Sequence, residues 1–120
     1  MTKTVVRFTV SLAIDEEKFD QFESVAKSMI AGILKEPGAR GYDWFLSADR
    51  KRCRLVETYA DQRAVLTHMT GPVVQELVPK ILETASITSF EVYGDPGPEA
   101  AKMLAEVGAE IFPLWHGLGR

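Results

Sequence analysis

The first stretch of the chain, Thr4–Leu12, alternates between hydrophobic and polar positions. Its apolar side chains fall at every second residue: Val6, Phe8, Val10 and Leu12. This period of two predicts a strand with one well-buried side. The period then changes to steps of three and four, at Phe19, Phe22, Ala26, Met29 and Ile33. That spacing predicts a helix, which Asp15 caps and Glu36-Pro37-Gly38 ends.

The middle of the chain repeats the change from strand to helix. Gly41–Ser47 and Arg52–Tyr59 alternate as strands around a turn at residues 48–51, which predicts a hairpin. Asp61 then caps a short helix, which Gly71 ends. Pro72 begins a further helix, in which Pro79 removes one backbone hydrogen bond and is expected to cause a bend. Ser86–Gly94 reads as the fourth strand.

The predicted order β-α-β-β-α-β is that of a ferredoxin-like α+β fold. In this fold an antiparallel four-stranded sheet carries its helices on one face. Residues 1–94 are expected to form this domain. Large apolar groups occur on both faces of the second strand, with Tyr42, Trp44 and Leu46 opposing Phe45. Because an open aromatic face is unusual on a monomer, we expect a homodimer that packs sheet against sheet.

Residues 95–120 form a C-terminal extension of this minimal fold. Asp95-Pro96-Gly97-Pro98 reads as a linker, and Glu99–Val107 as a short amphipathic helix. The remaining segment, Ala109–Arg120, is too apolar to stay in water and needs a surface. The sequence leaves open whether that surface belongs to the same subunit or to a partner.

Length and composition narrow the class of protein. The chain has 120 residues, enough for one domain, and a net charge of −3, which argues against a partner with a phosphate backbone. The basic run Arg50–Arg54 reads as a solvated turn and strand edge. Cys53 is the only cysteine, so neither an intrachain disulfide nor a cysteine-based zinc site is expected. No apolar run resembles a signal peptide or a membrane span, and we expect a cytoplasmic protein without membrane contact.

Two strings of residues resemble a known family. Glu36-Pro37-Gly38-Ala39-Arg40-Gly41-Tyr42 is the first, and the second runs from Glu57-Thr58-Tyr59-Ala60-Asp61 into the helix Ala64-Val65-Leu66-Thr67-His68-Met69. Together they resemble the antibiotic biosynthesis monooxygenase family of dimeric α+β barrels, including its quinol-monooxygenase-like members. The likeness covers about Thr4–Gly94. It implies the ferredoxin-like fold and a homodimer more firmly than any one reaction.

The resemblance also implies a chemistry and a set of site residues. An electron-rich phenol, quinol or anthrone would lose a proton and pass an electron to O₂ itself, with no cofactor and no metal. His68 would be the catalytic base or hydrogen-bond partner. The substrate-binding candidates are Trp44, Tyr59 and Phe8 as ring walls, Arg54 (or Arg7) at an oxyanion, and His116 as part of a lid.

Each candidate has a structural alternative. His68 can be a packed helix histidine, while Trp44 and Phe8 can belong to the core or to a dimer interface. Arg7 and Arg54 can pair with Glu57 or Glu91, and Trp115 can anchor the tail at the dimer interface. The protein as a whole can therefore be a dimer that binds a small hydrophobic ligand without chemistry, or a purely structural dimer.

Two departures from the family limit what can be transferred. The chain contains no Asn, so the Asn-Trp-His set of the heme-degrading branch is not available. Pro72 stands about where many quinol-monooxygenase-like members carry a second histidine. A catalytic dyad with His68 is therefore not supported.

Overall fold

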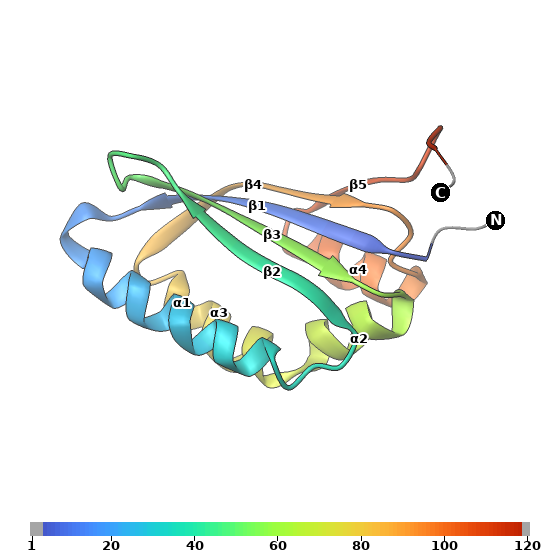
Figure 1. Cartoon of the computed structure of the whole chain (residues 1–120), viewed down its shortest axis with the longest axis horizontal. Helices are drawn as coiled ribbons and strands as arrows, with labels where there is room; N and C mark the ends of the chain where they lie inside the picture. Colours follow the sequence, from blue (N-terminus) through green and yellow to red (C-terminus); the bar gives the residue numbers. More distant parts are fainter. Residues whose placement is uncertain (1–3, 119–120) are drawn as a thin grey trace.

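One mixed sheet forms the scaffold of the molecule in the computed structural model, which describes residues 4–118 (Figure 1). The strands are β1 (Val6–Ile14), β2 (Ala39–Leu46), β3 (Arg52–Tyr59), β4 (Ala85–Tyr93) and β5 (Glu110–Phe112). They lie in the order β2-β3-β1-β4-β5. The pairings among β1, β2, β3 and β4 are antiparallel, and β5 pairs in parallel with β4. The four expected strands are confirmed, and β5 is an addition that the sequence pattern missed.

The helices lie along one face of this sheet, as Figure 1 shows. The helical segments are η1 (Glu16–Lys18), α1 (Phe19–Ile33), α2 (Gln62–Thr70), η2 (Val73–Leu77), α3 (Val78–Ile81) and α4 (Pro98–Glu106). Two predicted caps are present. Asp15 accepts a hydrogen bond from the backbone of Glu17, and Asp61 accepts one from the backbone of Ala64. The arrangement confirms the ferredoxin-like α+β fold.

The helix that begins at Pro72 is irregular. Residues Val73–Leu77 form a π-helix, in which the backbone N–H of Val78 bonds to the carbonyl of Val73. The α-helical segment α3 follows, with Pro79 in its first turn. Pro79 has no N–H to offer the carbonyl four residues earlier, and its ring would crowd that carbonyl. A wider turn before Pro79 relieves both problems. The irregularity expected at Pro79 is therefore the π-helix η2.

Two clusters of buried side chains fill the space between sheet and helices, and β1 contributes to both. Val10, Leu12 and Ile14 pack with α1 and α3, whereas Val6 and Phe8 pack with α2 and α4. Cys53 is buried in the first cluster, and burial raises the pKa of its thiol to about 11. It is therefore a neutral core residue at physiological pH.

The sheet register decides which side chains of β2 face the helices. Tyr42 lies opposite Glu57, and Trp44 lies opposite Leu55, whose side chain is buried under the helices. Residues directly opposite in an antiparallel pair share a face, so both aromatic rings point toward the helices. The helix-free face instead carries Phe45, Tyr93 and Phe112 among charged and polar residues.

The C-terminal extension packs on its own subunit as far as Phe112. Ala100 and Leu104 of α4 join the cluster that contains α2, and β5 extends the sheet beside β4. Beyond β5 the chain leaves the sheet, and the side chain of Trp115 is 88% exposed. No helix within residues 4–118 has the length and apolar character needed to cross a membrane.

Candidate active site

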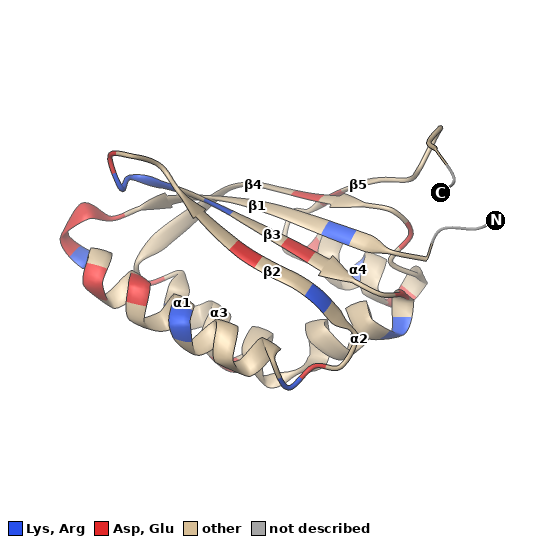
Figure 2. Ribbon diagram, viewed as in Figure 1, with Lys and Arg blue, Asp and Glu red and all other residues tan. Residues whose placement is uncertain are grey.

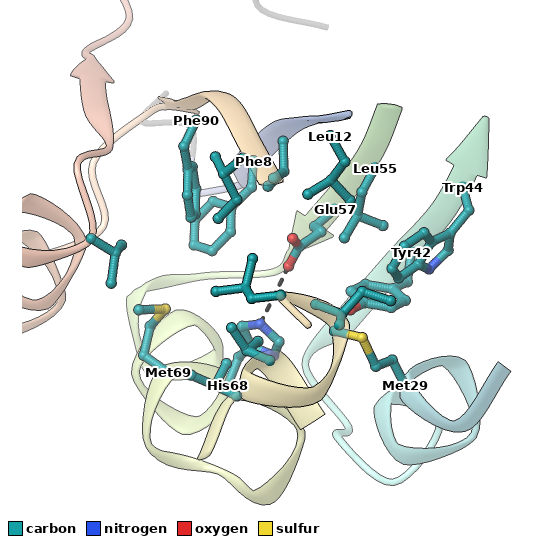
Figure 3. A pocket seen from close by; sticks show the side chains of 17 residues that line it. Phe8, Leu12, Met29, Tyr42, Trp44, Leu55, Glu57, His68, Met69 and Phe90 are labelled. Atoms are coloured by element: carbon teal, nitrogen blue, oxygen red, sulfur yellow. Dashed lines mark ion pairs between the residues drawn. The ribbon is translucent and has the colours of Figure 1, made fainter. Parts of the chain in front are cut away.

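A pocket of about 330 Å³ lies between the sheet and the helices. Strands β1, β2, β3 and β4 line it on one side, and α1, α2, η2 and α3 line it on the other (Figure 3). Aliphatic, aromatic and methionine side chains make up most of the lining. The ionisable groups in the lining are Tyr42, Glu57 and His68. An apolar cavity with a few converging polar groups is the usual form of a small-molecule site.

His68 lies at the floor of this pocket between two carboxylates. Its Nδ1 atom is 3.1 Å and 3.3 Å from the two carboxylate oxygens of Glu36, which follows α1. Its Nε2 atom is 3.3 Å from Oε1 of Glu57 on β3, the ion pair drawn dashed in Figure 3. Both ring nitrogens can be donors only in the imidazolium form. The geometry therefore favours a protonated ring.

The pKa of His68 is raised accordingly. Burial alone would lower the pKa of this imidazole, because it disfavours the charged form. The hydrogen bonds to Glu36 and Glu57 and the charges of both carboxylates outweigh that effect and raise the pKa to about 9. At neutral pH this favours the protonated form of His68, which has no lone pair to accept a proton as a base, one of its two predicted roles. The other role, hydrogen-bond partner, fits the protonated ring.

Glu57 has a carboxylate oxygen that remains available to accept a hydrogen bond or a proton from a ligand. Its side chain is almost fully buried, and its Oε1 atom accepts a hydrogen bond of 2.5 Å from the hydroxyl of Tyr59 in addition to facing His68. Within residues 4–118, Oε2 of Glu57 has no hydrogen-bond partner. Trp44 Nε1 is the one fully buried polar side-chain atom left without a partner in the described chain. Oε2 of Glu57 therefore keeps contact with the open volume of the pocket.

Tyr42 places a hydroxyl group on the same face of the sheet. It is the cross-strand neighbour of Glu57, and its ring lies 6.4 Å from that of His68. The edge of the Trp44 ring packs against it at a centroid distance of 5.9 Å. Burial raises the pKa of Tyr42 well above its ordinary value, and the charges of Glu57 and Glu36 raise it further. The phenol therefore stays protonated.

The structure brings some of the predicted site residues together and separates others. His68, Trp44 and Phe8 line the pocket. Tyr59 lies directly behind it, with its ring 4.9 Å from that of His68 and its hydroxyl on Glu57. The structure therefore brings these four residues together around one pocket.

The remaining candidates lie elsewhere. Arg7 and Arg54 are exposed on the helix-free face, where neither forms an ion pair within the described chain. Their suggested partners are engaged differently: Glu57 holds His68, and Glu91 accepts a hydrogen bond from the Tyr93 hydroxyl. His116 stacks on Trp115 in the exposed tail and is not part of the pocket wall.

The sequence reasoning overlooked Glu36, Glu57 and Tyr42 as site residues. Glu57 had a detectable signal, because it occupies the buried register of β3 between Leu55 and Tyr59. A carboxylate at such a position needs a partner inside the protein. No three His, Cys, Asp or Glu residues between positions 4 and 118 are grouped so that they could hold a metal ion.

Comparison with known proteins gives one family match. The model of the family described as antibiotic biosynthesis monooxygenase matches residues 5–80, which is more than half of the chain. The match includes Tyr42, Glu57 and His68. A search of curated proteins finds no match.

Several solved structures share the fold. MupZ from Pseudomonas fluorescens superposes with a TM-score of 0.81 at 23% identity, covering 98% of this chain and 95% of MupZ. An antibiotic biosynthesis monooxygenase, provisionally so assigned, from Nitrosomonas europaea has a TM-score of 0.69 at 18% identity, covering 82% and 96% of the two chains. A similarly assigned protein from Caulobacter crescentus has a TM-score of 0.66 at 18% identity, covering 75% and 86%. At 98% coverage the similarity to MupZ necessarily extends into residues 95–120. Identities this low establish the fold alone.

Proposed function

The chain belongs to the antibiotic biosynthesis monooxygenase family, and on that premise we propose that it is a cofactor-independent monooxygenase of a small aromatic substrate. The observation that supports this most is the free Oε2 atom of Glu57 at the floor of an apolar pocket. A carboxylate in such surroundings is a general base for an acidic O–H or C–H group. The substrate class is an electron-rich phenol, quinol or anthrone, for which ionisation is the step that permits reaction with O₂.

The shape and lining of the pocket suit such a molecule. Its volume of about 330 Å³ is at the lower end of the range for small-molecule sites, which matches a ligand of a few fused rings. Phe8, Trp44 and Phe90 offer aromatic walls, and Met29 and Met69 offer adaptable ones. Such a lining excludes water, and water would otherwise compete for the proton and protonate the substrate anion.

The charges around Glu57 favour transfer of a proton from the substrate to this carboxylate. Glu36, Glu57 and His68 together carry a net charge of −1 when the carboxylates are ionised and the imidazole is protonated. When Glu57 takes the substrate proton, that charge moves to the substrate and the remaining Glu36–His68 pair is neutral. The total charge inside the pocket does not change. The imidazolium stays 3.3 Å from Glu57 and within reach of the new anion, which it stabilises.

The oxygen step balances without a further reductant. The substrate anion passes one electron to O₂, and the resulting pair of radicals combines to form a C–O bond, which gives a peroxide. For a substrate with a CH₂ group, the peroxide takes up the proton held by Glu57 and loses water to leave a carbonyl. The sum is CH₂ + O₂ → C=O + H₂O, and Glu57 is again ionised.

The proposed assembly is a homodimer that packs through the helix-free face of the sheet. This face carries Phe45, Tyr93 and Phe112. Among its charged residues are Arg7 and Arg54 on β1 and β3, and Glu91 and Glu110 on β4 and β5. Figure 2 shows a basic position on β1 and an acidic position on β4. In a twofold contact one patch meets its own copy, so opposite signs on the two sides of the face can pair across the axis. Dimerisation is common in this family.

Oxygen uptake tests the enzymatic proposal. We expect the wild-type protein to consume O₂ with at least one member of a panel of hydroquinones, naphthols and anthrones, without added metal or flavin. Glu57→Gln removes the base and keeps the side-chain volume, and uptake should fall by about 10²–10⁴-fold. Glu99→Gln, on the exposed side of α4 and outside both the pocket and the helix-free face, is the matched control and should behave as wild type. A protein that binds these compounds without consuming O₂ would instead be the non-catalytic ligand-binding dimer.

Light scattering tests the assembly independently. At micromolar concentration we expect about twice the chain mass of 13.3 kDa. Arg54→Glu places like charges opposite each other in the proposed contact and should favour the monomer, whereas Lys102→Glu on α4 should not. A wild-type mass equal to that of one chain would contradict the dimer.

A further inference from the structure

Tyr42 carries a hydroxyl group that the fold leaves unused beside the base. In residues 4–118 this hydroxyl has no hydrogen-bond partner, whereas those of Tyr59 and Tyr93 are both donated to glutamates. Unlike Trp44 Nε1, this hydroxyl is not fully buried, so it retains contact with the pocket that Tyr42 lines. A free O–H donor in a largely apolar cavity is available to a ligand oxygen.

The register places this donor directly next to the base. Tyr42 and Glu57 are opposite each other on β2 and β3, so their Cβ atoms are separated by only about 5 Å. Figure 3 shows both side chains extending from the sheet toward His68. A ligand that reaches Oε2 of Glu57 therefore also comes within reach of the Tyr42 hydroxyl.

The surroundings fix both the position and the protonation state of this donor. The Trp44 ring packs edge-on against Tyr42, and the His68 ring meets it from the helix side. Burial and the neighbouring Glu57 and Glu36 charges raise the pKa of Tyr42, so it keeps its proton beside an anion. A donor held in place before the reaction costs little reorganisation when charge develops.

We propose that Tyr42 is a catalytic residue that donates a hydrogen bond to the substrate oxygen on which negative charge accumulates while Glu57 removes the proton. This inference rests on the proposed role of Glu57. It narrows the substrate to molecules whose acidic C–H or O–H group is conjugated with an oxygen. Only in such molecules does the negative charge left by deprotonation accumulate on an oxygen that Tyr42 can contact. It also assigns the site a partial reaction that needs no O₂, namely reversible proton removal from carbon.

For an anthrone this partial reaction has a simple balance. The C–H bond of the methylene group breaks, and Oε2 of Glu57 gains the proton. The electron pair of that bond forms a C=C bond to the neighbouring ring carbon. Ring π-electrons shift to form a C=C bond at the carbonyl carbon, and the carbonyl π-electrons become the charge on oxygen. Tyr42 keeps its own proton and donates a hydrogen bond to that oxygen. Reversal in D₂O returns a deuteron from Glu57 to the carbon.

Deuterium exchange without oxygen tests this role. Anthrone is incubated with the protein in D₂O under nitrogen, and the loss of its methylene proton signal is followed by NMR against a protein-free control. We expect the wild type to accelerate exchange. Tyr42→Phe removes one hydroxyl and should slow exchange by about 10²–10³-fold, mainly through kcat, as for the loss of one oxyanion donor. Ser28→Ala removes a hydroxyl on the exposed side of α1, outside both the pocket and the helix-free face, and should exchange at the wild-type rate.

The outcomes separate this inference from the proposed function. If Tyr42→Phe exchanges as fast as wild type while Glu57→Gln does not exchange, Tyr42 is not the donor and the base is retained. If the wild type exchanges protons but consumes no O₂, the oxygenase proposal fails and the role of Tyr42 stands. If the wild type does not accelerate exchange, the role of Tyr42 is wrong. Unchanged thermal unfolding of Tyr42→Phe excludes loss of folding as the cause.

Discussion

The stability of the protein should fall as the pH rises from about 6.5 to 9, because of His68. The pKa of this buried imidazole is about 9 in the folded protein, whereas an unfolded chain has the ordinary value of 6.5. Between these two values the folded state holds a proton that the unfolded state has lost. Stability then decreases with pH, since the folded state binds more protons. The contribution is complete below pH 6.5 and is lost as the pH passes 9.

The size of the effect follows from the same two values. The slope is about 1.4 kcal/mol per pH unit for one proton, so the interval from 6.5 to 9 corresponds to about 3 kcal/mol of unfolding free energy. His68 is only 4% exposed, so solvent screening reduces this little. The ionisable groups that face the ring are Glu36, Glu57, Tyr42 and Tyr59. Both tyrosines have pKa values raised above 10 and do not titrate in this interval.

Urea unfolding at several pH values and fixed protein concentration measures the slope, and NMR titration of the imidazole measures the pKa directly. His116→Gln is the matched control, because that histidine lies in the exposed tail. It should leave the slope unchanged. Glu36→Gln removes the charge that faces Nδ1 and should lower the pKa of His68 and flatten the slope. Stability that is constant or rises between pH 6.5 and 9, or an NMR pKa near 6.5, would refute the reasoning.

Three substitutions test other parts of the structure by chemical denaturation. Tyr59→Phe removes the hydrogen bond to buried Glu57 and should cost about 2 kcal/mol; no loss would mean that Glu57 finds an equal partner elsewhere. Leu104→Ala, at a fully buried position of α4, should cost about 2–5 kcal/mol, and a negligible cost would show that the extension is not part of the core. Gly38→Ala places a methyl group onto Ala64 Cβ and should cost about 1–3 kcal/mol, whereas a neutral result would show that α2 can move aside.

Much of the fold could be predicted because hydrophobic periodicity reports which face of each element is buried. The alternation from Val6 to Leu12 and the three- and four-residue steps from Phe19 to Ile33 correspond to β1 and α1. The fifth strand could not be found in this way. Residues Glu110–Phe112 are too few to show a period, and their pairing with β4 depends on where α4 places them.

The site could be predicted only in part, because its central contacts are distant in the sequence. Glu36 and His68 are 32 positions apart and meet where the loop that follows α1 passes α2. His68 was found through its family motif, but its protonation state depends on two carboxylates that periodicity does not place. The face on which Tyr42 and Trp44 lie was also undecided until the register with β3 was known.

The central claim is that Glu57 removes a proton from the substrate before O₂ reacts. The most direct measurement is the O₂-uptake rate of wild type and Glu57→Gln with a series of phenols or anthrones of increasing acidity. If Glu57 is the base, the variant should lose most activity with weakly acidic substrates and approach the wild type with substrates that are already ionised in solution. A wild-type-to-variant ratio that stays the same across the series would contradict the account.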